Sequence, residues 1–240
     1  MARTFKILMP YLFKQYLRSN RYVAPFLFYL VFIAFTYSQK PLYVMTAYMF
    51  SCIFTYCFSA WLMYSLASSE ELVQQQLIIL HVEKENYYYI GKIVFILMLV
   101  ILFSTLAVFY PIAGGFFIRK VYALDVFGAL LSHWVIGLLG ISTAILFDQR
   151  LINSGKLRLL YLVGVLIVSI IQVPLSMHYS FVKWLTIVFP PAYLIISRFG
   201  LIDVMSFSSF YKLMADLIIA IAYSMILIFL SLKFMRNKKF

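Results

Sequence analysis

Long, uninterrupted apolar runs fill most of this sequence and constrain its fold more than any other feature. Hydrophobic residues make up 65% of the 240 residues and charged residues only 12%, whereas a soluble domain has about a quarter charged residues. In lipid, only helices and closed barrels satisfy all their backbone polar groups. Because the runs do not alternate between apolar and polar residues, the barrel is excluded. The sequence therefore predicts an all-α, polytopic membrane protein that forms a single transmembrane domain.

The apolar runs provide six predicted membrane spans, since one crossing needs about 20 apolar residues. The first is short for a bilayer, so we expect flanking residues to complete it. The predicted spans cover residues 22–37, 43–66, 93–116, 126–147, 159–175 and 213–232.

The positions of the basic residues predict the orientation. If the N-terminus lies in the cytoplasm, most of the 20 Lys and Arg residues fall in cytoplasmic segments, as the positive-inside rule requires. Only the Arg119-Lys120 pair argues for the reverse. We therefore expect a multi-pass protein of the cell membrane with both termini in the cytoplasm, and with Lys40 and Arg198 facing outward. The net charge of +12 is explained by this placement, so no nucleic-acid partner is expected.

An amphipathic helix is predicted over residues 4–18. Apolar residues repeat there at helical spacing, and Lys6, Lys14 and Arg18 lie on the opposite face. Such a helix lies in the membrane interface, where the three basic side chains anchor it to anionic headgroups. Pro10 is expected to kink it. The alternative is an ordinary solvated leader.

The connection between the second and third spans predicts a short helix over residues 69–82. Ser68 and Glu71 have the spacing of a capping box at its start. Val73, Leu77 and Leu80 then form one apolar stripe. This helix is either a docking site for a soluble partner or a passive interfacial connector.

The segment 181–200, before the last span, is apolar but is interrupted by Pro190-Pro191. Half-segments this short cannot cross a bilayer, and proline breaks a helix. We expect two short re-entrant helices that meet at the two prolines and are buried against the spans.

The sequence indicates no catalytic chemistry of its own. It has no phosphate-binding Gly-x-x-x-x-Gly-Lys motif, and its histidines lie in separate segments, which argues against a metal site. His133, within the fourth span, is expected to form a hydrogen bond across a helix interface. Cys52 and Cys57 are expected to remain free thiols, and Asp216 is expected to pair with Lys212.

The order of these segments and two motifs resemble ABC-2 type transporter permeases. One motif is the broken segment Phe189-Pro190-Pro191-Ala192-Tyr193. The other, in the connection after the second span, consists of Glu70-Glu71, Gln74-Gln75-Gln76, His81, Tyr87-Tyr88-Tyr89 and Lys92. In that family this connection carries the coupling helix, which docks on the ATPase. The sequence departs from the family in having no Arg within residues 70–79.

The resemblance implies the permease subunit of an ATP-driven exporter, with no cofactor of its own. ATP and Mg²⁺ are then bound by separate ABC ATPase subunits, and a second permease, identical or paralogous, completes the transporter. The chain looks most like exporters of amphipathic peptides in Gram-positive bacteria, which serve toxin export or peptide self-protection. The alternative is a non-transporting membrane protein, such as an intramembrane protease relative or a scaffold. The residues expected to contact the ATPase are Glu70, Glu71, Val73, Gln74, Leu77, Leu80 and His81.

Overall fold

The computed structural model describes residues 2–82, 85–178 and 188–237, and the elements named within them are helices. They are α1 (Ala2–Ser19), α2 (Val23–Ser38), α3 (Val44–Ala67), α4 (Leu72–His81), α5 (Glu85–Ala113), α6 (Ala123–Ile145), α7 (Gly155–His178), α9 (Ala192–Gly200) and α10 (Phe207–Asn237).

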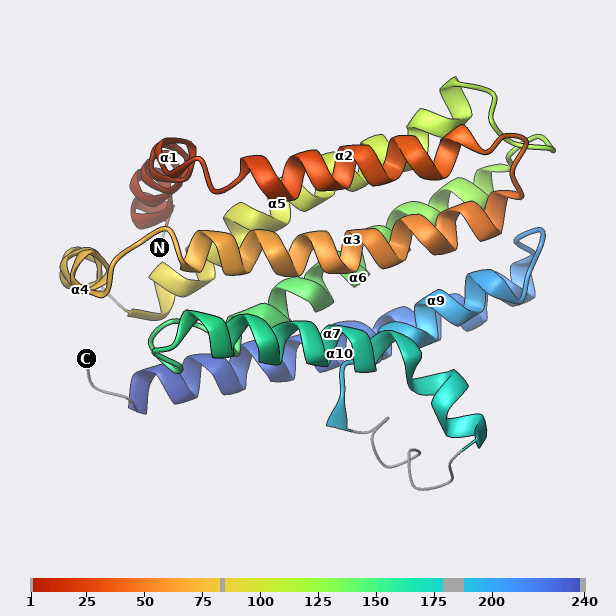
Figure 1. Cartoon of the computed structure of the whole chain (residues 1–240). Coiled ribbons are helices and arrows are strands. Elements are labelled where there is room, and N and C mark those ends of the chain that lie inside the picture. The colour runs from red at the N-terminus through yellow and green to blue at the C-terminus, as the bar shows by residue number, and fades with distance from the viewer. Residues whose placement is uncertain (1, 83–84, 179–187, 238–240) are drawn as a thin grey trace.

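Most of the helices run side by side along one direction, and α1 and α4 lie across one end of the bundle (Figure 1). We call this end, which holds α1, α4, the α6–α7 connection and the last turns of α10, the α4 end. The opposite, far end holds the connections from α2 to α3, from α5 to α6 and from α9 to α10. The axes of α1 and α2 differ by 82°. Since α2 lies along the bundle, α1 has the orientation of a helix in the plane of the interface.

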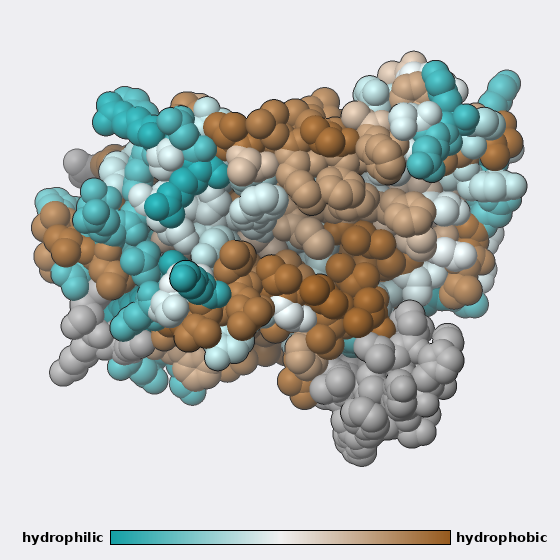
Figure 2. All heavy atoms as spheres, viewed as in Figure 1, coloured by the Kyte–Doolittle hydropathy of each residue, from teal (hydrophilic) through white to brown (hydrophobic). Residues whose placement is uncertain are grey.

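Five of the described helices are long and apolar enough to cross a membrane: α3, α5, α6, α7 and α10. Apolar side chains cover the middle of the bundle, and hydrophilic ones gather towards its two ends (Figure 2). The prediction of an all-α polytopic membrane protein is therefore confirmed. With 16 residues, α2 is about 24 Å long, less than the roughly 30 Å of the hydrocarbon core. By itself α2 is therefore too short to cross, and the first of the six predicted spans stays a prediction.

The core of the bundle is the contact between α3 and α6. Two glycines of α6 allow close packing, one against α3 and the other against α5. A Cβ atom at Gly140 would lie 2.1 Å from Ser59 Oγ and 2.5 Å from the carbonyl oxygen of Tyr56. A Cβ atom at Gly137 would lie 2.5 Å from Val100 Cγ1 on α5. Small residues of this kind let membrane helices pack closely, because lipid supplies no hydrophobic driving force between them.

Two helices extend beyond the apolar runs from which the spans were predicted. α5 begins at Glu85 rather than near residue 93, and α10 begins at Phe207 rather than near residue 213. Their first turns carry polar and aromatic side chains that an apolar run does not include. Hydropathy therefore identified the membrane-crossing part of each helix and missed the part that projects from it.

The broken segment before α10 is described only in its second half. α9 begins directly after Pro190-Pro191 and has nine residues, about 13 Å, which is too short to cross. It packs against α3 and α7, so the break at the prolines is confirmed. The first expected helix falls largely on residues 179–187, which lie outside the described residues.

The far end is tied together by backbone hydrogen bonds between two connections. The N–H of Leu42 donates to the carbonyl of Phe116, and the N–H of Ile118 donates to the carbonyl of Leu42, both at 3.0 Å. Nearby, an Arg119 Nη atom lies 2.7 Å from an Asp125 carboxylate oxygen. The pairing neutralises Arg119, one of the two basic residues that opposed the predicted orientation.

Two sequence expectations about single side chains have different outcomes. His133 Nε2 lies 2.8 Å from Ser51 Oγ on α3, so its hydrogen bond across a helix interface is confirmed. The pairing of Asp216 with Lys212 is wrong, because Asp216 pairs at 2.7 Å with Arg198 of α9. The i, i+4 rule considers one helix only, and it misses a partner that another helix supplies.

Candidate functional site: α4 and the charges beneath it

The apolar stripe of α4 faces away from the protein. The side chains of Val73, Leu77 and Leu80 are 63%, 55% and 80% exposed, respectively. Gln75, a polar residue, is instead fully buried. An ordinary surface helix has the reverse arrangement, with its apolar face towards the core. An apolar stripe exposed at the end of the bundle, beyond the membrane-crossing part, is typical of a surface that binds a partner.

Most of the other residues expected to contact a partner also lie on the surface. Glu71, Gln74 and His81 are exposed, and His81 Nδ1 lies 2.6 Å from the carbonyl oxygen of Leu77 in the preceding turn. Glu70 does not lie on the surface: it is only 2% exposed. Its carboxylate is therefore not available to an external partner.

The expected capping box at the start of α4 is wrong. The N-cap of α4 is Glu71, and no side chain caps the helix. The Ser68 N–H instead donates to the carbonyl of Tyr64, and the Ser69 hydroxyl donates to that of Leu66, so both serines terminate α3. The local pattern was outweighed by the contact that Glu70 makes with another helix.

Glu70 is held by two residues of α5. Its Oε2 lies 2.6 Å from Lys92 Nζ, and both side chains are fully buried. The hydroxyl of Tyr88 donates to the same carboxylate oxygen. Lys92 Nζ also lies 4.4 Å from the centre of the Tyr88 ring, a cation–π geometry. The segment between α3 and α4 is thereby fixed to the first turns of α5.

A second ion pair joins the α6–α7 connection to the start of α5. The guanidinium of Arg150 pairs with Glu85, and its Nη1 donates to the hydroxyl of Tyr89 at 3.3 Å. The Arg150 N–H also donates to Asp148 Oδ1 at 2.9 Å. Burial raises the pKa of the Asp148 carboxyl, although the positive charges of Lys92 and Arg158 oppose this shift.

These ionisable residues form one group at the α4 end, which we call the charge network. It contains three acidic and three basic residues, so its formal charges balance. Its members are Glu70, Glu85, Lys92, Asp148, Arg150 and Arg158.

This network was not predicted, because Arg150 and Arg158 were used only to predict the membrane orientation and Glu70 was expected to face a partner. One signal in the sequence could have indicated it. Tyr88 and Lys92 are four residues apart, and therefore share a face of the helix that enters the third span.

α1 packs beside the network on α5. Its buried face consists of Leu8, Leu12 and Tyr16, and the contact is so close that a Cβ atom at Gly91 would lie 2.3 Å from a methyl carbon of Leu8. Lys6, Lys14 and Arg18, the predicted membrane anchors, are all exposed. The helix continues through Pro10 as one element.

Within the described parts of the chain, no group of three or more His, Cys, Asp or Glu side chains is placed to hold a metal ion. No protein-family model matches the sequence, and no curated protein and no solved structure is significantly similar to the chain. A functional assignment therefore rests on the geometry of this chain.

Proposed function

We propose that this protein is the membrane-spanning permease subunit of an ATP-driven ABC exporter, in which α4 docks on a separate ATPase subunit. The observation that carries the proposal is the exposed stripe of Val73, Leu77 and Leu80 on a helix at the α4 end. Amphipathic helices bind partners by placing such a stripe in an apolar groove. The distribution of Lys and Arg favours a cytoplasmic location for this end, where an ATPase has access to it.

The charge network gives α4 a connection to the membrane-crossing helices. A buried ion pair resists separation, because leaving one charge buried without its partner costs several kcal/mol. A displacement of α4 therefore carries α5 with it through Glu70 and Lys92. The pair between Glu85 and Arg150 extends the connection to the segment that precedes α7. In this mechanism, ATP binding and hydrolysis on the partner reorient the spans.

The interior of the bundle supports an external source of energy. The polar side chains that are buried at mid-membrane depth in the described helices are uncharged, such as Ser51, Thr55 and His133. Transport coupled to protons or sodium ions generally requires charged residues deep in the membrane. We propose an apolar or amphipathic cargo, specifically an amphipathic peptide exported from a Gram-positive cell for toxin release or self-protection. A second permease subunit, identical or paralogous, completes the transporter.

The alternative of an intramembrane protease relative is not favoured by the geometry. Such an enzyme needs carboxylates free to act on a substrate, whereas Glu70 is buried against Lys92 and the neighbouring Glu71 is exposed. A non-transporting scaffold could also use α4 for docking. The identity of the protein that α4 binds separates the scaffold from the exporter.

The proposal is tested by replacing one residue of the stripe. Buried apolar anchors contribute roughly 1–3 kcal/mol each to such contacts, so Leu77→Asp is expected to abolish binding of the ATPase. The measurement is co-purification from the native membrane with the tagged protein, with mass spectrometry to identify a subunit that contains a phosphate-binding loop. The matched control is Leu201→Asp, which replaces an exposed leucine at the far end.

The control variant is expected to retain the ATPase as the unmodified protein does. If no ATPase co-purifies with the unmodified protein, the exporter proposal is wrong. If Leu77→Asp retains as much ATPase as Leu201→Asp, then α4 is a passive connector and the contact lies elsewhere.

A further inference from the structure

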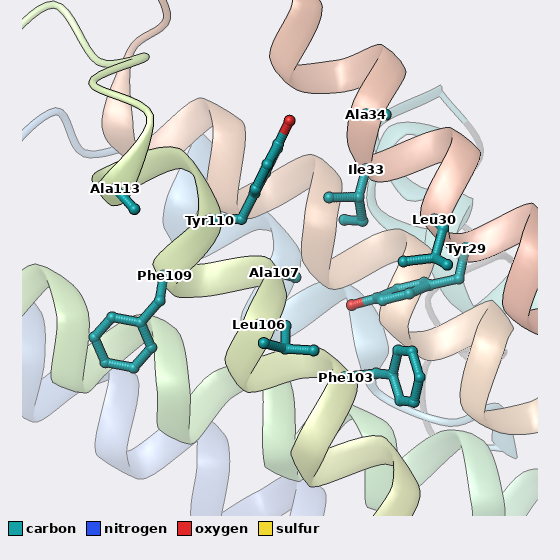
Figure 3. A pocket seen from close by; sticks show the side chains of 10 residues that line it. All are labelled: Tyr29, Leu30, Ile33, Ala34, Phe103, Leu106, Ala107, Phe109, Tyr110 and Ala113. Carbon is teal, nitrogen blue, oxygen red and sulfur yellow. The ribbon is translucent and has the colours of Figure 1, made fainter.

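A groove of about 600 Å³ lies between α2 and α5 in the membrane-crossing part of the protein. α2 contributes Tyr29 and Ile33 to its lining, and α5 contributes Phe103, Ala107 and Tyr110 (Figure 3). The lining is almost entirely apolar, and the volume lies within the range of small-molecule sites.

The length and position of the groove match one leaflet of a bilayer. Its lining on α5 extends from Phe103 to Ala113, which is about 15 Å along the helix axis at a rise of about 1.5 Å per residue. Half of a hydrocarbon core of about 30 Å has the same depth. Because Ala113 is the last residue of α5, the groove runs from mid-membrane to the far end of the bundle.

A positive charge lies at the far end of this groove. The ring of Tyr110 is 5.4 Å from that of Phe116, and Lys40 Nζ lies 5.0 Å from the centre of the Phe116 ring. Lys40 is exposed, and the described residues supply no carboxylate that pairs with it. The groove thus combines an apolar body of leaflet depth with one unpaired cation at the level of the headgroups.

We propose that this groove binds one acyl chain of an anionic phospholipid, whose headgroup contacts Lys40. Charge complementarity at Lys40 favours an anionic over a zwitterionic headgroup. A helix of a second protein chain is the other occupant that an apolar groove of this depth admits, and the test below separates it from a lipid. The proposal does not depend on the exporter function.

Native mass spectrometry of the detergent-solubilised protein tests the proposal, with phosphatidylglycerol or phosphatidylcholine added at equal concentrations. Lys40→Gln removes the cation, and Ala34→Phe fills the groove from an exposed position on α2. The matched controls are Lys120→Gln, an exposed cation at the same end, and Ala222→Phe, an exposed alanine on α10. Both targets and both controls are exposed, so these replacements leave the core intact, which a single symmetric peak in size-exclusion chromatography verifies.

The unmodified protein and both controls are expected to retain one phosphatidylglycerol per chain in preference to phosphatidylcholine. Lys40→Gln should lower this preference about fivefold, the effect of one Lys near a membrane surface. Ala34→Phe should abolish retention of either lipid in the groove. Equal retention of the two lipids by the unmodified protein, or equal retention by Ala34→Phe and Ala222→Phe, would overturn the proposal. A change of oligomeric state in Ala34→Phe alone would also overturn it, because the groove would then be an interface between protein chains.

Discussion

At the scale of single residues, the pair of Glu70 and Lys92 shows how two charges are accommodated at the edge of the membrane. Both side chains are fully buried, and their charged atoms lie 2.6 Å apart. Each charge alone would be costly in this position, whereas the pair is nearly balanced against its desolvation. The pair therefore adds little net stability but fixes the position of the segment that leads into α4.

This balance predicts the effect of breaking and of removing the pair. Glu70→Gln leaves the charge of Lys92 buried without its partner, and Lys92→Met does the same to the charge of Glu70. Each variant should therefore lower the free energy of unfolding by about 3–5 kcal/mol. The double variant should recover most of this loss. The measurement is the thermal midpoint of the detergent-solubilised protein, with Glu71→Gln, at an exposed neighbouring site, as the control. Additive losses in the double variant would show that the two side chains do not act as a pair.

At the scale of helices, the close contact between α3 and α6 requires a residue without a side chain, Gly140, on α6. Gly140 lies against Ser59 and the backbone of Tyr56, with no room for a methyl group. Backbone atoms cannot move aside as the end of a flexible side chain can. The distance between these two helices is therefore limited by this glycine, whereas Gly137, one turn earlier, allows the close contact of α6 with α5.

Gly140→Ala is therefore expected to destabilise the protein by about 1–3 kcal/mol, the usual cost of overpacking a core. Gly164→Ala is the matched control, because nothing lies within 4 Å of the added methyl group on α7. The control should leave the thermal midpoint unchanged or raise it slightly, since alanine favours a helix more than glycine does. Equal midpoints for the two variants would contradict the close packing of α3 and α6.

At the same scale, some features were predictable from the sequence and others were not. Apolar length indicated the spans, helical periodicity indicated the stripe on α4, and the two prolines indicated the break before α9. Each of these signals lies within one short segment of the sequence. The partners of Glu70 and Asp216 could not be predicted, since each is 18 or more residues away and is brought close only by packing. The exposure of the stripe on α4 could not be predicted either. Periodicity places Val73 and Leu77 on one face of the helix, but it does not say whether that face is buried or exposed.

At the scale of the whole molecule, the structure places the start of the chain and the last turns of α10 at the same end (Figure 1). The distribution of Lys and Arg predicts that this end is cytoplasmic. Three positions outside the spans report on it: His81 on α4, and Lys40 and Lys120 at the far end.

The predicted orientation is tested by labelling with a membrane-impermeant maleimide in a variant without Cys52 and Cys57. A cysteine introduced at Lys40 or Lys120 should react in intact cells, because each side chain is exposed at the far end. A cysteine introduced at His81 should react only after the membrane is permeabilised. Labelling of the His81 position in intact cells would reverse the orientation and place α4 out of reach of a cytoplasmic ATPase.

In the proposed mechanism, the hydrogen bonds of Leu42 with Phe116 and Ile118 serve as a pivot for α5. They hold the connection between α2 and α3 against the connection between α5 and α6, at the opposite end from α4. α5 has 29 residues and is about 43 Å long. With its far end held, a displacement of about 3 Å at its α4 end is a tilt of only about 4°, given that length. A modest push on α4 therefore becomes a small rotation of a whole membrane helix, without the far end having to come apart.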